Sequence, residues 1–319
     1  MIRSDKEKQM IKIPVILDTD PGVDDFMAIM LANSSDRLDI KAVTVVAGNQ
    51  TLKKTSKNAL DIASFLKMKT RIAKGAEKPV NKEIEIADEV HGESGIGSVV
   101  LPDGNLEFDS DYAWDVMYQE AVKAEGKLQI IAVGPLTNVA VAILKYRDLK
   151  KYVDRIVLMG GSTDYGNNGV YSEFNIWEDP FAADIVFKSE IPVTMVGLNV
   201  TMNTVLTEPH IKELKSIKSA VSKEAGELLD SMSRFYRSLG RDFIPLHDAL
   251  AVAGVISPSL LECRDYYVAV ETRRGLNEGR TVVDIDRSHR DRLPNASVAV
   301  KGNTEMFVDM LRKMLEYYQ

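Results

Sequence analysis

The chain contains a single cysteine, Cys263, among its 319 residues. One cysteine excludes an internal disulfide framework and any metal site built from several thiolates, which is typical of a reducing compartment, so we expect a cytoplasmic protein. No window approaches the roughly 18 apolar residues of a membrane-spanning helix, and we expect no membrane contact. The N-terminal MIRSDKEKQM mixes charges and precedes only the short run IPVIL, so no signal peptide is predicted.

Basic residues are also in deficit, with 40 Lys and Arg against 47 Asp and Glu and a formal net charge of −7. A nucleic-acid-binding protein usually carries a basic excess, so nucleic acid is not an expected partner. We expect a small-molecule ligand instead. The apolar fraction of 45% and the charged fraction of 27% are typical of a globular protein with a large core.

Short apolar runs alternate with helical spacing as far as Val200. The predicted strands are 11–17, 40–48, 70–76, 128–134, 155–161 and 191–200, and the predicted helices are 24–35, 51–68, 112–126, 137–146 and 180–189. This alternation is typical of a mainly parallel sheet covered by helices on both faces. Helical stretches at 208–239 and 247–256, a hairpin within 266–285 and a final helix at 305–318 follow. No linker or repeat divides the chain, so we predict one α/β domain over residues 1–319.

Polar residues come directly after five of the predicted strands. These segments are DTDPGVDD, GNQ, GPLTN, GG with the following YGNNGVYSEFN, and NVTMN. Ligands of open parallel sheets bind beyond the carboxyl ends of the strands. The sequence therefore predicts a shared pocket at this edge of the sheet.

The segment DTDPGVDD carries four carboxylates, Asp18, Asp20, Asp24 and Asp25. Helix capping by Asp20, with Pro21 as the first helical residue, explains one or two of them. It does not explain two aspartates at the exit of a strand, because converging carboxylates repel unless a cation neutralises them. Oxygen ligands without Cys or His nearby favour calcium or magnesium over zinc.

Two of the four histidines stand in distinctive segments. His247 precedes Asp248 in IPLHDAL, where a capping aspartate beside a core histidine is the plainer interpretation. His91 lies in EVHGESGIG, a Gly-rich loop that is longer than a simple connection requires.

Taken together, the motifs resemble the inosine-uridine-preferring nucleoside hydrolases. They run from about Val15 to Val255 and comprise, in order, ILDTDPGVDD, VTVVAGNQT, HGESGIG, VGPLTN, VLMGG, SEFNIWEDP and IPLHDA. The resemblance implies a single Rossmann-like α/β domain with a mixed, mainly parallel sheet, assembled as a homodimer or homotetramer. It also implies an enzyme of nucleoside salvage that hydrolyses the N-glycosidic bond of ribonucleosides to ribose and free base.

The resemblance further implies a tightly bound calcium ion. Its ligands would be Asp20, Asp25, the Val133 carbonyl and Asp248. The ribose hydroxyls would be held by Asp24, Asn49, Asn167, Glu173 and Asn175, with Asn168 as an alternative to Asn167. Asp18 would support the site without binding the metal.

Hydrolysis of the bond requires an activated water and a protonated leaving base. Calcium is a weaker Lewis acid than zinc, so we expect Asp20 to act as a general base beside the metal. A histidine titrating near neutrality is a suitable proton donor, and we expect His247 to protonate the leaving base. Calcium would fix the 2′ and 3′ hydroxyls, so deoxyribonucleosides should react poorly.

Other residues are expected around the sugar and the base. His91 would contact the ribose or the base, and Met159 and Phe174 would line the sugar, although buried Met and Phe are also common in cores. Tyr236 and Arg237 are candidate neighbours of the base, and helix packing explains the aromatic spacing equally well. A pyrimidine preference is favoured because His91 and His247 are both present.

Two alternatives give the strand-end aspartates another role. In a haloacid-dehalogenase-like phosphohydrolase, Asp18 would be a nucleophile beside magnesium, but Asn49, Glu173, Asn175 and His247 would have no function. A noncatalytic nucleoside-binding protein on the same fold is the other alternative. The presence of both a candidate base and a candidate acid favours an enzyme.

Overall fold

The computed structural model describes residues 12–288 and 291–319, so the MIRSDKEKQM segment considered above lies outside the described residues. An eight-stranded sheet has the order β3-β2-β1-β4-β5-β6-β12-β9. Its strands are β1 Ile13–Thr19, β2 Leu38–Val45, β3 Arg71–Lys74, β4 Leu128–Ala132, β5 Val153–Met159, β6 Val193–Val196, β9 Leu261–Tyr266 and β12 Ala296–Gly302. All neighbours pair in parallel except β9, which is antiparallel to β12. The predicted mixed, mainly parallel α/β fold is confirmed.

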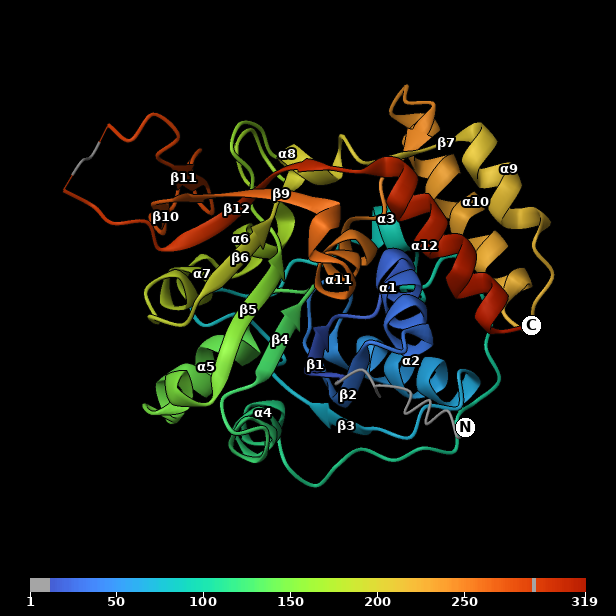
Figure 1. Cartoon of the computed structure of the whole chain (residues 1–319), viewed down its shortest axis with the longest axis horizontal. Coiled ribbons are helices and arrows are strands. Elements are labelled where there is room, and N and C mark those ends of the chain that lie inside the picture. The colour runs from blue at the N-terminus through green and yellow to red at the C-terminus, as the bar shows by residue number, and fades with distance from the viewer. Residues whose placement is uncertain (1–11, 289–290) are drawn as a thin grey trace, which may run out of the picture.

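Helices cover both faces of the sheet, on opposite sides in Figure 1. One face is covered by α1 Val23–Ser34, α2 Leu52–Phe65, α10 Ser222–Ser238, α11 His247–Ile256 and α12 Thr304–Tyr317, and the other by α4 Ala113–Lys123, α5 Thr137–Lys145 and α7 Pro180–Phe187. Strand β1 feeds both cores: Val15 and Leu17 belong to the first and Ile16 to the second. This division follows from the alternation of side chains along a strand.

The chain reverses its direction of winding at β1. This strand pairs with β2 on one side and with β4 on the other, and later strands extend the sheet outward from β4. The carboxyl ends of β1 and β4 lie side by side, since the Val133 amide donates to the Asp18 carbonyl over 2.8 Å. In open α/β sheets such a reversal leaves a crevice at this point, and ligands bind there.

Short elements complete the described chain. They are α3 Asp88–His91, η1 Leu149–Lys151, α6 Phe174–Glu178, α8 Leu198–Thr201, β7 Leu206–Thr207, α9 Glu208–Ser216, β8 Phe243–Ile244, η2 Pro258–Leu260, β10 Val268–Val270 and β11 Thr281–Val283. The antiparallel pairing of β10 with β11 confirms the predicted hairpin. Among residues 12–288 and 291–319, no helix combines the length and apolar character needed to span a membrane.

Two predictions of secondary structure differ from the fold, and two strands of the sheet were missed. The strand predicted at 191–200 ends at Val196, because the chain turns into α8 and the Leu198 amide donates to the Gly161 carbonyl. The helical stretch predicted at 208–239 is divided into α9 and α10. Strands β9 and β12 were not predicted, although they complete one edge of the sheet.

Candidate active site

A cavity of about 600 Å³ opens at the carboxyl edge of the sheet. Four strand ends contribute to its wall, through Asn49 after β2, Val133 after β4, Met159 in β5 and Leu198 after β6. The other predicted site residues on this wall are Asp24, His91, Asn167, Glu173, Phe174, Asn175, Tyr236, His247 and Asp248. The structure therefore brings together residues that are far apart in sequence. Asp20 and Asp25 do not line the cavity, and both are fully buried.

Three buried carboxylates, from Asp24, Asp25 and Asp248, each offer an oxygen within 4.8 Å of the others. The first two lie in the first turn of α1 and the third in the first turn of α11, where helix dipoles favour negative charge. Asp25 also accepts the Gly22 amide over 2.9 Å. Gly22, not Asp20, is therefore the N-cap of α1, Asp25 at the third helical position accepts its amide, and α1 begins at Val23 rather than at the proline.

Asp20 is not a member of that three-carboxylate group. One of its oxygens, Oδ2, accepts the Asn49 amide over 2.7 Å, whereas Oδ1 has no hydrogen-bond partner within the described chain. Gly48 and Gly134 pack against the same carboxylate so closely that a Cβ at either position would overlap it. A buried oxygen left without a partner is costly unless a ligand satisfies it.

Burial raises the pKa of all four aspartates in this region. Repulsion by Asp25 raises the pKa of Asp20 and Asp24 further, the latter to about 7, and Asp24 has the same effect on Asp248. None of the four forms an ion pair with a lysine or arginine within residues 12–288 and 291–319. An oxygen-rich, uncompensated group of this kind fits a hard divalent cation.

Asp18 is held away from the cavity. Its Oδ1 accepts hydrogen bonds from the Thr44 hydroxyl at 2.6 Å and the Asn138 amide at 2.8 Å. Burial raises its pKa to about 7. These contacts join the end of β1 to β2 and α5, a supporting arrangement like the one the resemblance implies.

The sugar-binding candidates are fixed by hydrogen bonds to one another and to the main chain. Asn49 donates to Asp25 Oδ2 over 2.9 Å, and Asn175 donates to the carbonyls of Val133 and Met159 over 2.9 and 3.1 Å. Glu173 accepts three main-chain amides, including those of Gly161 and Asn175, each at 3.0 Å. Burial raises its pKa to about 7.

Both asparagines of the 167–168 pair reach the cavity wall. Asn167 accepts the Phe174 amide through Oδ1 over 2.9 Å, which ties its loop to α6. Asn168 forms a β-bridge with Ser172 instead. The loop is thus anchored to the residues immediately before and after Glu173.

Burial lowers the pKa of both histidines of the cavity. Burial, reinforced by the charge of Arg241, lowers the pKa of His247 to about 4, so the expectation that it titrates near neutrality is wrong for this structure. Its Nε2 lies 3.0 Å from the Tyr236 hydroxyl and its Nδ1 lies 2.7 Å from Thr201 Oγ1. Burial lowers the pKa of His91 to about 3, and its Nδ1 accepts the Val23 amide over 3.0 Å.

Besides Tyr236, the less polar part of the cavity lining includes Tyr165, Trp177, Met202, Met232, Phe235, Leu239 and Arg241, none of which the sequence singled out. Arg237, predicted beside the base, does not line the cavity and instead pairs with Glu208 at 3.5 Å on the surface. Helical spacing in RFYRSLGRDF was the only available signal, and it also fits packing in the core.

The segment that carries His91 is fastened to α6. Lys82 Nζ lies 3.1 Å from the centroid of the Trp177 ring and 3.9 Å from Glu178 Oε2. The Glu85 amide donates to Glu178 Oε1 over 3.2 Å. These contacts fix the start of the segment whose residues 85–91 line the cavity, and His91 itself lies in the one-turn helix α3 rather than in a plain loop.

Comparison with known proteins gives a consistent family match. A family model described as inosine-uridine preferring nucleoside hydrolase matches residues 15–309. The pyrimidine-specific ribonucleoside hydrolase RihA of Photobacterium profundum is 40% identical over 308 residues, covering 96% of this chain and 99% of that protein. RihA of Salmonella typhimurium is 38% identical over 309 residues, covering 96% and 99%.

Solved structures resemble the chain over almost its full length. The plant nucleoside hydrolase PpNRh1 has a TM-score of 0.90 at 30% identity and covers 96% of this chain and 99% of its own. The purine-preferring ribonucleoside hydrolase of Gardnerella vaginalis has a TM-score of 0.88 at 32% identity, with coverages of 95% and 98%.

Proposed function

Because the chain belongs to the inosine-uridine preferring nucleoside hydrolase family and hydrolyses the N-glycosidic bond of ribonucleosides, we propose that it does so with bound calcium and a preference for pyrimidine nucleosides. One observation carries the metal proposal. Three buried carboxylates converge, the buried Oδ1 of Asp20 has no hydrogen-bond partner, and no lysine or arginine in the described chain forms an ion pair with any of these four residues. Both alternative functions are set aside by the family match. A phosphoryl-accepting Asp18 is further disfavoured because its carboxylate is held away from the cavity.

We propose Asp20, Asp25, Asp248 and the Val133 carbonyl as the calcium ligands. The absence of nitrogen and sulfur donors from this set supports calcium over zinc. When bound, the ion supplies positive charge that fixes the 2′ and 3′ hydroxyls of ribose and makes a nearby water more acidic. Asp24 belongs to the same buried group, and its place on the cavity wall supports a role in binding the sugar hydroxyls.

The sugar would be held by Asp24, Asn49, Asn167, Glu173 and Asn175, with Met159 and Phe174 packed against it. Rigid hydrogen bonding supports this role, since Glu173 and Asn175 are already oriented by the main chain. Fixed carboxylates and amide oxygens around C1′ favour the positive charge that develops on the ribosyl ring as the bond breaks. Such preorganisation costs no rearrangement during the reaction.

Asp20 would take the proton from the attacking water. Its Oδ1 is the unpartnered oxygen, whereas Oδ2 is held by the Asn49 amide, so one oxygen orients the carboxylate and the other is free to accept.

Protonation of the leaving base would fall to His247, in contact with Tyr236. Burial raises the pKa of the Tyr236 phenol, so the phenol stays protonated and can donate a hydrogen bond to the leaving base. A neutral imidazole with a proton on Nε2 can donate a hydrogen bond as negative charge grows on the base. His91 accepts at Nδ1, so its Nε2 carries the proton and can donate to the ribose or the base.

The pyrimidine preference rests on relatives and on the two histidines. Proteins that are 38–40% identical to the chain are named pyrimidine-specific, whereas a structure at 32% identity is named purine-preferring. Release of reducing sugar from uridine, cytidine, inosine and adenosine, with and without a calcium chelator, tests both proposals. Higher kcat/KM for uridine and cytidine, lost on chelation, is expected. Faster purine hydrolysis would contradict the preference, and full activity in chelator would contradict the calcium requirement.

We further propose a cytoplasmic homodimer or homotetramer in which residues 1–319 form one nucleoside-hydrolase domain. A free, exposed Cys263 supports a reducing compartment. Sedimentation velocity at several protein concentrations measures the assembly state, and a monomer at micromolar concentration would contradict the proposal.

A further inference from the structure

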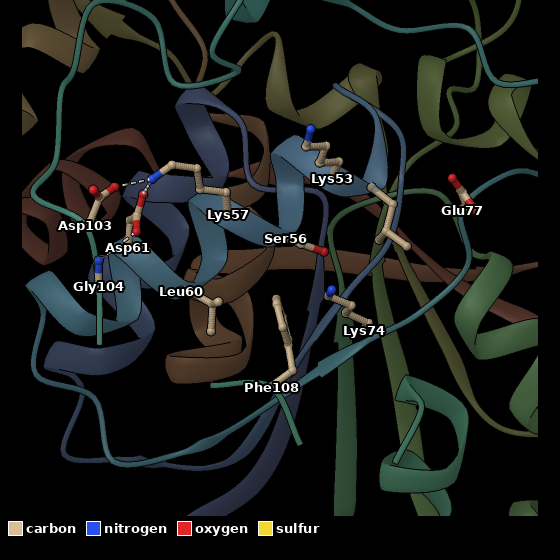
Figure 2. A pocket seen from close by; sticks show the side chains of 11 residues that line it. Lys53, Ser56, Lys57, Leu60, Asp61, Lys74, Glu77, Asp103, Gly104 and Phe108 are labelled. Carbon is tan, nitrogen blue, oxygen red and sulfur yellow. Dashed lines mark hydrogen bonds and ion pairs between the residues drawn. The ribbon is translucent and has the colours of Figure 1, made fainter. Parts of the chain in front are cut away.

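A second cavity, of about 580 Å³, lies along α2 and shares no wall residue with the candidate active site (Figure 2). Its walls come from α2, from Lys74 at the end of β3 and from the segment that carries Gly104 and Phe108. Leu52, Leu60 and Phe108 make part of the wall apolar. The rest of the wall carries the charged side chains and contains one buried hydroxyl group.

That hydroxyl belongs to Ser56, which is only 3% exposed and whose Oγ has no hydrogen-bond partner within the described residues. Figure 2 shows Ser56 Oγ directed into the cavity, in the space between Lys53 and Lys74. A serine inside a helix commonly bonds a preceding carbonyl, and this one does not. A buried hydroxyl without a partner indicates a missing ligand, because leaving it unsatisfied is unfavourable.

The lysines of the cavity are not equivalent. Lys57 is already paired with Asp61 at 2.6 Å and with Asp103 at 2.8 Å, and Asp61 also accepts the Gly104 amide. Lys53 and Lys74, in contrast, form no ion pair within residues 12–288 and 291–319. The exposed Glu77 is the remaining carboxylate of the wall.

Two further features favour an anion at the Ser56 end. Lys53 and Ser56 lie in the first two turns of α2, where the helix dipole adds positive potential. Lys74 Nζ lies 4.5 Å from the centroid of the Phe108 ring, so cationic and aromatic surfaces are adjacent. A ligand with a charged head and a flat apolar body would match both surfaces.

We propose that this α2 cavity binds a small phosphate monoester. Its phosphate accepts hydrogen bonds from the Ser56 hydroxyl and from the ammonium groups of Lys53 and Lys74, and its ring or sugar lies along Phe108 and Leu60. A phosphate fits better than a carboxylate, because its oxygens point in several directions and its charge approaches two at neutral pH.

Calorimetric titration of the purified protein with phenyl phosphate tests the proposal. This probe has no diol and therefore avoids the sugar-binding residues. We expect one site per chain, a loss of affinity of about tenfold or more in Lys53→Ala/Lys74→Ala, and a change within about twofold in Lys69→Ala, which removes a charge beyond the far end of α2. Phenol, which lacks the phosphate, should not bind.

Ser56→Ala tests the hydrogen bond without changing the charge of the cavity, and the quantity measured is the Tm with and without phenyl phosphate. Without ligand its Tm should equal or exceed that of the wild type, because an unpartnered hydroxyl is removed, whereas the Tm increase produced by phenyl phosphate should shrink. No binding, equal losses in Lys69→Ala, or displacement of phenyl phosphate by saturating ribose would overturn the proposal. Hydrolysis of uridine by the same variants is measured separately and should be unchanged, so a failure here leaves the proposed catalytic function intact.

Discussion

The two walls of the candidate active site are built on different principles. The proposed ribose wall, comprising Asp24, Asn49, Glu173, Asn175 and Asp248, consists of polar groups at strand ends and helix starts. Asn49, Glu173 and Asn175 are held by hydrogen bonds to Asp25 or to the main chain, and Asp24 and Asp248 belong to the buried carboxylate group. The proposed base wall, comprising Tyr165, Met232, Phe235, Tyr236 and Arg241, consists largely of apolar and aromatic side chains on α10 and nearby loops.

This difference separates reaction from specificity. Polar groups that are held in place before the substrate arrives stabilise charge in the transition state without reorganisation, and small displacements are costly. Aromatic and Met side chains bind by area and shape and tolerate exchange. Changes to the ribose wall, or to the buried Asp20 and Asp25, should therefore abolish hydrolysis. Changes to the base wall should instead alter which nucleobase is preferred.

The largest effect is expected for Asp20→Asn. We expect kcat/KM for uridine to fall about 10³-fold, because the candidate general base can no longer accept a proton. The Tm measured in chelator should rise, since one member of a repulsive buried group becomes neutral. Asp265→Asn, on the exposed face of β9, is the matched control and should leave both quantities unchanged. A loss below about tenfold would remove Asp20 as the base.

Removal of the metal should produce a slightly smaller effect. Dialysis against a chelator is expected to reduce turnover about 100-fold and to lower the Tm, because the ion binds only the folded protein and relieves repulsion among the carboxylates. Added Ca²⁺ should restore both. The comparison of the walls would fail if metal removal slowed the hydrolysis of uridine and of inosine by clearly different factors, or if it slowed neither.

His247→Ala tests the boundary between the walls. We expect a loss of about 100-fold with uridine but less than about tenfold with p-nitrophenyl riboside, because nitrophenolate leaves without being protonated. Measurement of kcat/KM for the two substrates gives this ratio directly, and His210→Ala, outside the cavity, serves as the control. Equal losses on both substrates would exclude His247 as the proton donor.

The smallest effect is expected for Arg241→Met on the base wall. The ratio of uridine to inosine hydrolysis should change about tenfold, whereas discrimination against 2′-deoxyuridine should be unchanged. The pKa of His247 should rise from about 4, because the positive charge of Arg241 contributes to lowering it; a proton NMR titration measures the shift. Arg237→Met, on the same stretch but at the surface, should change neither quantity. An altered response to the 2′ hydroxyl would show that the walls are not independent.

The residues proposed for the ribose wall could be picked out from the sequence because they lie in short motifs of the family that the sequence resembles, and the structure brings them to one cavity. Asp24 and Asp25 follow β1 within one motif, and Glu173 and Asn175 lie in another, so a short string of residues carries each part. Alternating strands and helices then place the motifs at one edge of the sheet. The same alternation explains why the order of the main elements was predicted correctly.

The base wall could not be predicted in the same way. Phe235 and Arg241 reach the cavity through the rotation of α10 and the turn that follows it, and helical spacing does not distinguish a cavity from a core. The break between α9 and α10 was missed because the segment SIKSAV contains neither glycine nor proline. The low pKa of His247 depends on burial and on the charge of Arg241, which no linear motif records.

The glycines at 48 and 134 impose a limit on how this enzyme could be diversified. A methyl group at either position would collide with the Asp20 carboxylate, so even the smallest replacement should disable the centre. A saturation library aimed at new nucleobases would therefore return active clones from positions on α10 such as Met232 and Phe235, and almost none from the glycines. Substrate preference can therefore change by substitutions on α10, whereas the residues that pack against Asp20 do not tolerate replacement.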